Sequence, residues 1–203
     1  MARPREFEES DVLNAALGVF WAKGYDGTSI EDLVDATGVG RASLYGAFGD
    51  KARLFARVLD HYLERVRALD AVDEGATPRE ALVEITSRWV GGACATDGPR
   101  GCLLQQSCAA ESIAPIAKDI AARASADRQK LLESLIARGQ KSGDFPSGTR
   151  PVELASFLLI VQQGIASAAR AGASKHELTA TMRLALDRVM GEAKAARGAR
   201  RAG

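Results

Sequence analysis

The sequence has few of the residues from which disulfide, metal and catalytic sites are built. Its 203 residues include two histidines and three cysteines, Cys94, Cys102 and Cys108, which have no CxxC spacing. An odd number of cysteines in this arrangement argues against a disulfide framework and against a structural zinc site. The sequence also lacks an HExxH motif, a glycine-rich phosphate loop and a plausible Cys-His pair. We therefore expect no enzyme activity, no metal site and no cofactor.

Long apolar runs and a strong excess of one charge are missing as well. No apolar run approaches the roughly 18 to 20 residues of a membrane-spanning helix, so no membrane contact is expected. The first residues, MARPREFEESD, are charged and lack a signal core, which predicts a cytoplasmic protein. The net charge is +1, and four basic residues among the first fifty face nine acidic ones. A nucleic-acid-binding surface would therefore have to be a local basic face.

Helical periodicity is clear, above all in residues 28–51, TSIEDLVDATGVGRASLYGAFGDK. Apolar residues recur at helical spacing in SIEDLVDA and again in RASLYGAF. Thr28 or Ser29 is placed to cap the first of these helices, and Gly38 is placed to end it. Two helices joined by a short turn that contains glycine form a helix-turn-helix unit, whose second helix enters a DNA major groove. A helical hairpin without a DNA-binding role is the alternative.

The order of residues in this stretch resembles the signature of the TetR family of bacterial transcriptional regulators. About 45 to 50 residues carry the resemblance, at Thr28, Ile30, Leu33, the turn 36–39, Leu44, Tyr45, Phe48, Lys51 and Leu54. It implies an all-α fold of about nine helices, in which a long helix joins a three-helix DNA-binding head to a helical effector-binding and dimerisation domain. The corresponding domains are residues 1–50, with the reading head at 28–48, and residues 51–190. Residues 191–203 form a basic tail.

The resemblance also implies which residues contact DNA. Thr28 matches the residue that caps the second helix and contacts phosphate, with Ser29 beside it, and Lys51 matches the lysine that begins the fourth helix. The exposed positions of the recognition helix are Arg41, Ala42, Ser43, Tyr45 and Gly46. Arg41 is the best candidate for reading bases, because a guanidinium group pairs bidentately with guanine.

The N-terminal arm, the start of the recognition helix and the stretch after residue 50 allow further expectations. Arg3 and Arg5 in the arm 1–7 reach phosphates or a minor groove, or else belong to a solvated tail. Gly40 stands where the family commonly has a serine or threonine cap, which weakens the start of the recognition helix. From Asp50 to about Val72 a continuous apolar stripe predicts one long helix, and this helix would link the two domains mechanically.

Segment 100–112, RGCLLQQSCAAES, resembles a part of one TetR branch that lines the effector pocket. Cys102 opens a helix there, where the helix dipole lowers a thiol pKa, so it is a candidate redox or electrophile sensor. A small buried hydrophobic residue is the other interpretation. Polar residues in this segment either bind an effector or face solvent. The expected pocket residues are Trp89, Cys102, Gln105, Gln106, Phe157 and Gln162.

The resemblance implies that the last two predicted helices form, with their symmetry mates, a four-helix dimer interface. Residues 154–169 are almost free of charge, and small residues among them permit close helix approach. Such a helix must be buried on several sides, either against a second copy or within the monomer. The expected interface residues are Leu158, Val161, Gly164, Ile165, Ala168, Met182, Leu186 and Val189.

These observations together predict a ligand-responsive transcriptional repressor. A homodimer would present two recognition helices to a palindromic operator in double-stranded DNA, and a small-molecule effector would release it. Two alternatives remain open at this point. One is a thiol-based sensor that acts through Cys102, and the other is an architectural DNA-binding protein without an effector.

Overall fold

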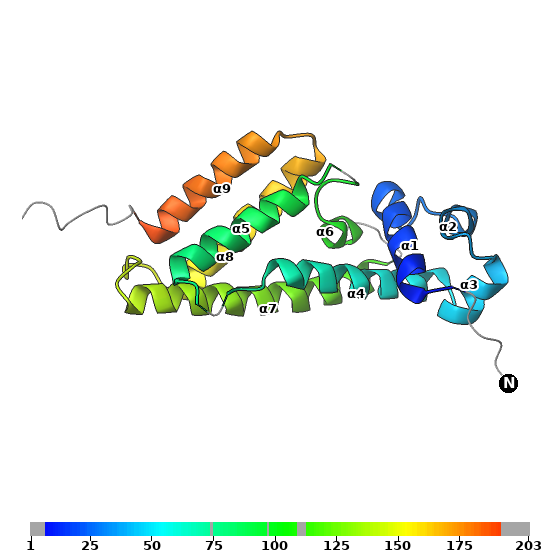
Figure 1. The fold of residues 1–203 in the computed structure, drawn as a ribbon, viewed down its shortest axis with the longest axis horizontal. Coiled ribbons are helices and arrows are strands. Elements are labelled where there is room, and N and C mark those ends of the chain that lie inside the picture. The colour runs from blue at the N-terminus through cyan, green and yellow to red at the C-terminus, as the bar shows by residue number, and fades with distance from the viewer. Residues whose placement is uncertain (1–6, 74, 97, 109–112, 192–203) are drawn as a thin grey trace, which may run out of the picture. The chain divides into compact units, whose positions relative to one another are not determined.

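The structure, a computed structural model, describes residues 7–73, 75–96, 98–108 and 113–191, and this part of the chain is helical without strands (Figure 1). Its nine helices confirm the predicted all-α class. They are α1 (Glu9–Lys23), α2 (Ile30–Thr37), α3 (Arg41–Phe48), α4 (Lys51–Leu69), α5 (Pro78–Ala93), α6 (Leu103–Ser107), α7 (Ala114–Lys141), α8 (Pro151–Arg170) and α9 (Lys175–Met190). Arg3, Arg5 and nearly all of the predicted tail lie outside the described residues.

The helices form two compact units, and neither unit is continuous in sequence. The first comprises Met1–Ala68 and Thr96–Ala124, and the second comprises Leu69–Ala95 and Ser125–Gly203. Segment 96–124, with α6, therefore groups with the helix-turn-helix. The functional division at residue 50 remains a prediction.

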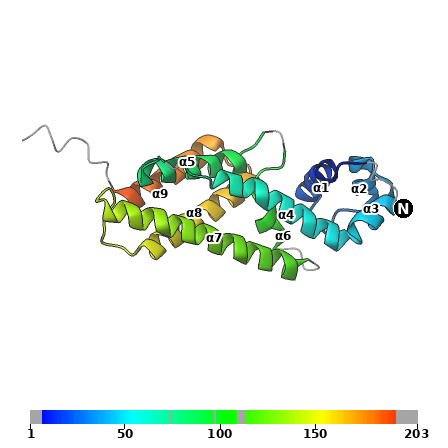
Figure 2. The same cartoon turned by 60° about the horizontal axis from the view of Figure 1, so that its bottom comes forward.

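The first unit is built around the N-terminal part of α4, where α1, α2 and α3 gather (Figures 1 and 2). Its core includes Phe20, Leu33 and Phe55, whose side chains are fully buried. The rings of Phe20 and Phe55 meet edge to face with centroids 4.8 Å apart, a favourable aromatic geometry. Leu103 of α6 belongs to the same apolar cluster. The segment predicted to line the effector pocket thus shares a core with the helices of the DNA-binding head.

Local signals in the sequence fix both ends of α2. Ser29 is the N-cap: its hydroxyl accepts a hydrogen bond from the Asp32 amide at 3.0 Å, and the Asp32 carboxylate accepts one from the Ser29 amide at 2.9 Å. Gly38 ends the helix with a φ of 67°, a left-handed conformation that suits glycine. As the sequence suggests, Gly40 opens α3 without any side-chain cap. Ser29 therefore sets the start of α2, and Gly38 begins the turn that leads into α3.

Replacing Ser29 with alanine should lower the free energy of unfolding by about 1 kcal/mol, because it removes the acceptor for the Asp32 amide at the start of α2. Chemical denaturation of the variant measures this loss. Ser43, exposed on α3, gives the matched control. An equal loss for Ser43→Ala would contradict the capping role of Ser29.

The second unit consists of α5, α8 and α9 packed together with the C-terminal part of α7. Its fully buried residues include Leu82, Ile85, Leu132 and Ile136. Gly139 allows a close approach in α7, since a Cβ atom there would lie 2.2 Å from the ring of Phe145. Other parts of α8 and α9 remain exposed, among them Ile160 and Leu184.

Five residues predicted for a dimer interface belong to this core, and their place in an interface stays a prediction. Each is at most 7% exposed in the single chain, so it offers little surface to a partner. The five are Leu158, Ile165, Met182, Leu186 and Val189. Their burial follows the alternative in which α8 and α9 cover each other. Val161, Gly164 and Ala168 retain exposed surface.

The apolar character of α8 corrects another expectation from the sequence. By length and composition this helix meets the criteria for crossing a membrane, with a mean hydropathy of 1.5 over its most apolar window. The core helix of a soluble protein meets the same criteria, and α8 contributes Ala155, Leu158 and Leu159 to the core of the second unit. Other apolar side chains on α8 are exposed, notably Phe157 and Ile160.

Candidate nucleic-acid interface

The recognition helix α3 has a buried side and an exposed side. Leu44 and Phe48 anchor it in the core of the first unit. All five positions predicted to face DNA are exposed: Arg41, Ala42, Ser43, Tyr45 and Gly46. Among these exposed residues only Arg41 and Tyr45 have long side chains, so they provide most of the reach toward DNA.

Arg41 is paired with a residue that the sequence analysis did not single out. Its Nη2 atom donates to Oε1 of Glu31, which lies in the first turn of α2. Both side chains are exposed, by 56% and 67%. The two residues are ten positions apart across the turn, and no local spacing rule links them.

The side chain of Thr28 has a structural role and does not cap α2. Its side chain is buried, and its hydroxyl donates to the carbonyl of Gly24 at 2.6 Å. Ser29 and not Thr28 caps α2, so the predicted cap at Thr28 is corrected, while the phosphate contact of Thr28 stays a prediction. The carbonyl of Thr28 accepts a hydrogen bond from Nζ of Lys51 at 2.7 Å.

Lys51 ties the beginning of α4 to the segment that precedes α2. Besides its bond to Thr28, its ammonium group lies 4.4 Å from the centroid of the Tyr25 ring, a cation–π distance. Burial, with smaller effects from the charges of Asp50 and Asp26, raises the pKa of the Tyr25 phenol, which therefore stays neutral beside the lysine. Lys51 also lines a small pocket together with Tyr45.

Other cations of the first unit are paired with carboxylates. Lys23 contacts Asp32 at 2.6 Å, and this contact together with the hydrogen bonds from Ser29 lowers the pKa of Asp32 to about 2. Arg57 pairs with Glu9. The acidic excess in the first fifty residues is thus used in part to neutralise the basic side chains of this unit.

The chain matches two family descriptions that cover most of its length. Residues 12–58 match the bacterial regulatory proteins of the tetR family, and residues 78–201 match the tetracyclin repressor-like C-terminal domain. The chain belongs to the TetR family. The match to the first description includes the helix-turn-helix, which confirms the predicted family and its regulatory, DNA-binding function.

Relatives of this TetR-family protein share most of its length. The HTH-type transcriptional repressor ComR of Escherichia coli (strain K12) is 32% identical over 182 residues, 87% of this chain and 86% of ComR. BdcR of the same organism, also an HTH-type transcriptional repressor, is 31% identical over 185 residues, 90% of this chain and 89% of BdcR. Both similarities include the head and the second unit.

A solved structure similar to this chain contains DNA. It holds a cysteine mutant of the TetR family regulator CifR with double-stranded operator DNA, at 31% identity and a TM-score of 0.80, and covers 91% of this chain and 98% of that one. SCO4454 of Streptomyces coelicolor, at 18% identity and a TM-score of 0.70, shows the shared fold; that similarity covers 88% of this chain and 91% of SCO4454.

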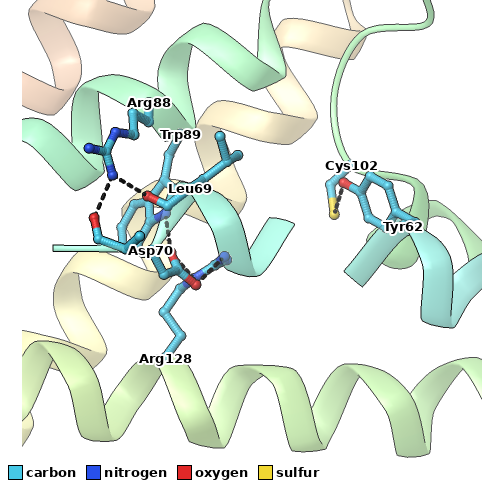
Figure 3. Close-up of polar contacts among 8 residues, drawn as sticks. Tyr62, Leu69, Asp70, Arg88, Trp89, Cys102 and Arg128 are labelled. Carbon is cyan, nitrogen blue, oxygen red and sulfur yellow. Dashed lines mark hydrogen bonds and ion pairs between the residues drawn. The ribbon is translucent and has the colours of Figure 1, made fainter. Parts of the chain in front are cut away.

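In the second unit of this TetR-family regulator, Trp89 belongs to a polar cluster (Figure 3). Its indole N–H donates to Oδ1 of Asp70 at 2.7 Å. Arg128 donates to the same carboxylate through three contacts of 2.9–3.1 Å and lies 4.8 Å from the Trp89 ring centroid. The polar atom of Trp89, a predicted pocket residue, is therefore satisfied within the chain. Sequence analysis identified neither Asp70 nor Arg128.

The same cluster holds the last residue of α4 and the residues that follow it. Arg88 donates through Nη1 to the carbonyls of Leu69 and Ala71, on either side of Asp70 (Figure 3). Charge-assisted hydrogen bonds of this kind are stronger than neutral ones. Side chains from α5 and α7 thus fix the segment in which α4 ends.

The remaining predicted pocket residues fall in both units. Cys102, Gln105 and Gln106 are in the first unit, whereas Phe157 and Gln162 are in the second. Gln105 is exposed and Gln106 is half-buried. Among the residues that the structure describes, Oε1 of Gln106 is buried without a hydrogen-bond partner, which leaves an acceptor free for a ligand donor or water.

Two cysteines flank α6. Cys102 is its N-cap, and its Sγ accepts a hydrogen bond from the Tyr62 hydroxyl at 3.4 Å (Figure 3). Cys108 is the C-cap. Burial, and then negative charge on Cys102, raises the pKa of the Cys108 thiol, while Lys118 partly offsets this effect. Cys108 is therefore held in the thiol form.

Proposed function

We propose that this TetR-family protein is a cytoplasmic transcriptional repressor that acts by binding DNA and not by catalysis. The observation that carries the proposal is the helix-turn-helix, in which a buried face anchors α3 and an exposed face presents Arg41 and Tyr45. Two relatives of the chain, ComR and BdcR, are named transcriptional repressors. The operator would be contacted by Ser29, Lys51 and the exposed residues of α3.

In vitro transcription distinguishes repression from activation. The template carries a promoter that overlaps a DNA site bound by the purified protein. Adding the protein should reduce the transcript, because an occupied site blocks the polymerase. An increase in transcript would contradict the proposal, and a template with a scrambled site provides the control.

The operator-bound form is a homodimer joined through α8 and α9. Phe157, Ile160 and Leu184 are 39%, 68% and 67% exposed, although α8 carries no charged residue between Glu153 and Arg170. Exposed apolar residues grouped on neighbouring helices indicate an interaction surface. A second copy is the occupant, because two half-sites of an operator require two recognition helices.

The double substitution Ile160→Glu and Leu184→Glu should produce a monomer in size-exclusion chromatography with light scattering. Buried charges would face each other across the interface, and the loss of bivalent binding should weaken operator affinity by about 10²- to 10⁴-fold. Val83, 42% exposed on α5, gives the control Val83→Glu. A dimeric double variant with unchanged affinity would place the interface elsewhere.

A small-molecule effector acts through the segment around α6. Cys102, Gln105 and Gln106 place polar groups beside an apolar core, and Oε1 of Gln106 has no partner among the described residues. Since α6 shares this core with α1 and α4, an effector that shifts α6 changes the packing of the DNA-binding head. Coupling of this type is typically about 1–3 kcal/mol.

A thiol sensor at Cys102 is a second candidate for the same regulation. Its side chain is partly exposed, and its sulfur accepts a hydrogen bond from the Tyr62 hydroxyl at 3.4 Å. A peroxide would transfer one oxygen atom to the Cys102 thiolate, giving a sulfenic acid and, after protonation, water. The CifR complexes with operator DNA were solved with cysteine mutants, so thiols merit this test.

Peroxide treatment should weaken operator binding of the unsubstituted protein, while Cys102→Ser should keep its affinity. Fluorescence anisotropy before and after treatment measures the change, and added reductant should reverse it. Cys94, buried in the second unit, gives the control Cys94→Ser, which should remain sensitive. Alkylation of Cys102 that leaves DNA affinity unchanged would count against the sensor and favour a reversibly bound effector.

A further inference from the structure

We propose that Glu31 is a positioning residue that directs Arg41 toward a G·C base pair and so sets the sequence specificity of the reading head. The inference rests on the proposed DNA-binding function and deepens it. It starts from the composition of the exposed side of α3. Ala42, Ser43 and Gly46 are too short to reach far into a groove. Of the two long exposed side chains, Arg41 and Tyr45, only Arg41 has the paired N–H donors that match guanine, so base recognition by α3 depends mainly on Arg41.

The contact between the two side chains occupies part of the guanidinium group. Nη2 of Arg41 donates to Oε1 of Glu31. A guanidinium has five N–H donors in a planar fork, so the pair leaves donors of Arg41 free. Guanine offers two acceptors, O6 and N7, which match two parallel N–H groups of arginine. Arg41, held by Glu31, therefore matches the guanine edge of a G·C pair in the major groove.

The backbone that carries Glu31 is held firmly by its neighbours. Ser29 and Asp32 form a reciprocal capping box at the start of α2, and Asp32 also pairs with Lys23. Glu31 stands between these residues and extends toward Arg41 on α3. A fixed carboxylate restricts the rotamers of the long arginine side chain, which reduces the entropy lost when the arginine binds a base.

The pair has little value for folding stability, because both side chains are exposed and solvent screens them. Its effect on DNA binding is different. A carboxylate on the reading face repels phosphates, so it weakens sequence-independent attachment by Arg41. The favourable contact with one base pair and the unfavourable contact with phosphate both increase discrimination between sequences.

Selection from a randomised duplex pool, followed by affinity measurements on the selected operator and an unrelated duplex, tests this role. The unsubstituted protein, Glu31→Gln, Arg41→Ala and the double variant are compared. Glu31→Gln should bind unrelated DNA more tightly and should lower the affinity ratio between operator and unrelated DNA by about fivefold or more. Arg41→Ala should lose enrichment of one G·C pair in each half-site. In the Arg41→Ala background, Glu31→Gln should change the ratio by less than about twofold, because Glu31 acts through Arg41.

Asp35, exposed on the same helix, provides the charge-matched control Asp35→Asn. This variant should keep the enriched sequence and the affinity ratio. An unchanged ratio and base preference in Glu31→Gln would overturn the inference, and so would an equal fall in Asp35→Asn or in the Arg41→Ala background. If the unsubstituted protein selects no sequence, the proposed function itself fails, and the inference fails with it.

Discussion

Replacing Arg128 with alanine should lower the free energy of unfolding by about 3–5 kcal/mol, because the change leaves the Asp70 carboxylate buried without its cation. The two side chains are only 12% and 16% exposed, and three hydrogen bonds join them. Arg128 also covers the ring of Trp89. The substitution therefore removes a charge partner and a packing contact at once.

Urea denaturation followed by circular dichroism measures this loss. Arg123 offers a control on the same helix, since it pairs with Asp119 one turn away and is 70% exposed. Arg123→Ala should change stability little, because an exposed pair of this type contributes little. Equal effects of the two substitutions would show that burial of the Asp70–Arg128 pair has no special importance.

Replacing Phe55 with alanine should destabilise the first unit by about 3–5 kcal/mol and should abolish operator binding under conditions in which that unit unfolds. Phe55 is fully buried on α4, and its ring meets Phe20 of α1 at 4.8 Å and Tyr25 at 5.1 Å between centroids. The substitution leaves a cavity where α4 supports the helices of the head. Phe55 is not itself one of the residues proposed to contact DNA.

Thermal unfolding and DNA affinity, measured on the same preparation of Phe55→Ala, separate stability from recognition. Ile116, 41% exposed at the start of α7, gives the control Ile116→Ala, which should change both quantities little. Lowering the temperature should restore DNA binding to Phe55→Ala in parallel with its folding. Full operator affinity in a protein with an unfolded first unit would contradict the supporting role of this core.

The sequence is most informative about features that neighbouring residues determine. Helical periodicity and the position of Gly38 locate α2 and α3, because the chain reversal between them depends on one glycine conformation. The sequence alone does not show whether Thr28 or Ser29 caps α2, since both residue types cap helices. In the structure the Thr28 hydroxyl is buried and donates to the carbonyl of Gly24, which leaves Ser29 as the cap.

Contacts between distant residues could not be predicted in the same way. Asp70 and Arg128 are 58 positions apart, and nothing in the local pattern of either residue indicates their pairing. Whether Leu158 and Met182 are buried within the chain or against a second copy could not be predicted for a related reason. An apolar helix predicts burial on several sides, but its partner depends on how α5, α8 and α9 pack in three dimensions. The pairing of Glu31 with Arg41 could not be predicted from the sequence either, because the two residues lie on different helices.

The central claim is sequence-specific DNA binding by a homodimer, and fluorescence anisotropy tests it directly. The purified protein is titrated at moderate salt into labelled duplexes from the region upstream of its own gene and into scrambled duplexes of equal composition. The account predicts that one upstream duplex, containing an inverted repeat, binds at least about 10³-fold more tightly than its scrambled counterpart. Equal affinity for every duplex, or full affinity of the monomeric Ile160→Glu, Leu184→Glu variant, would contradict it.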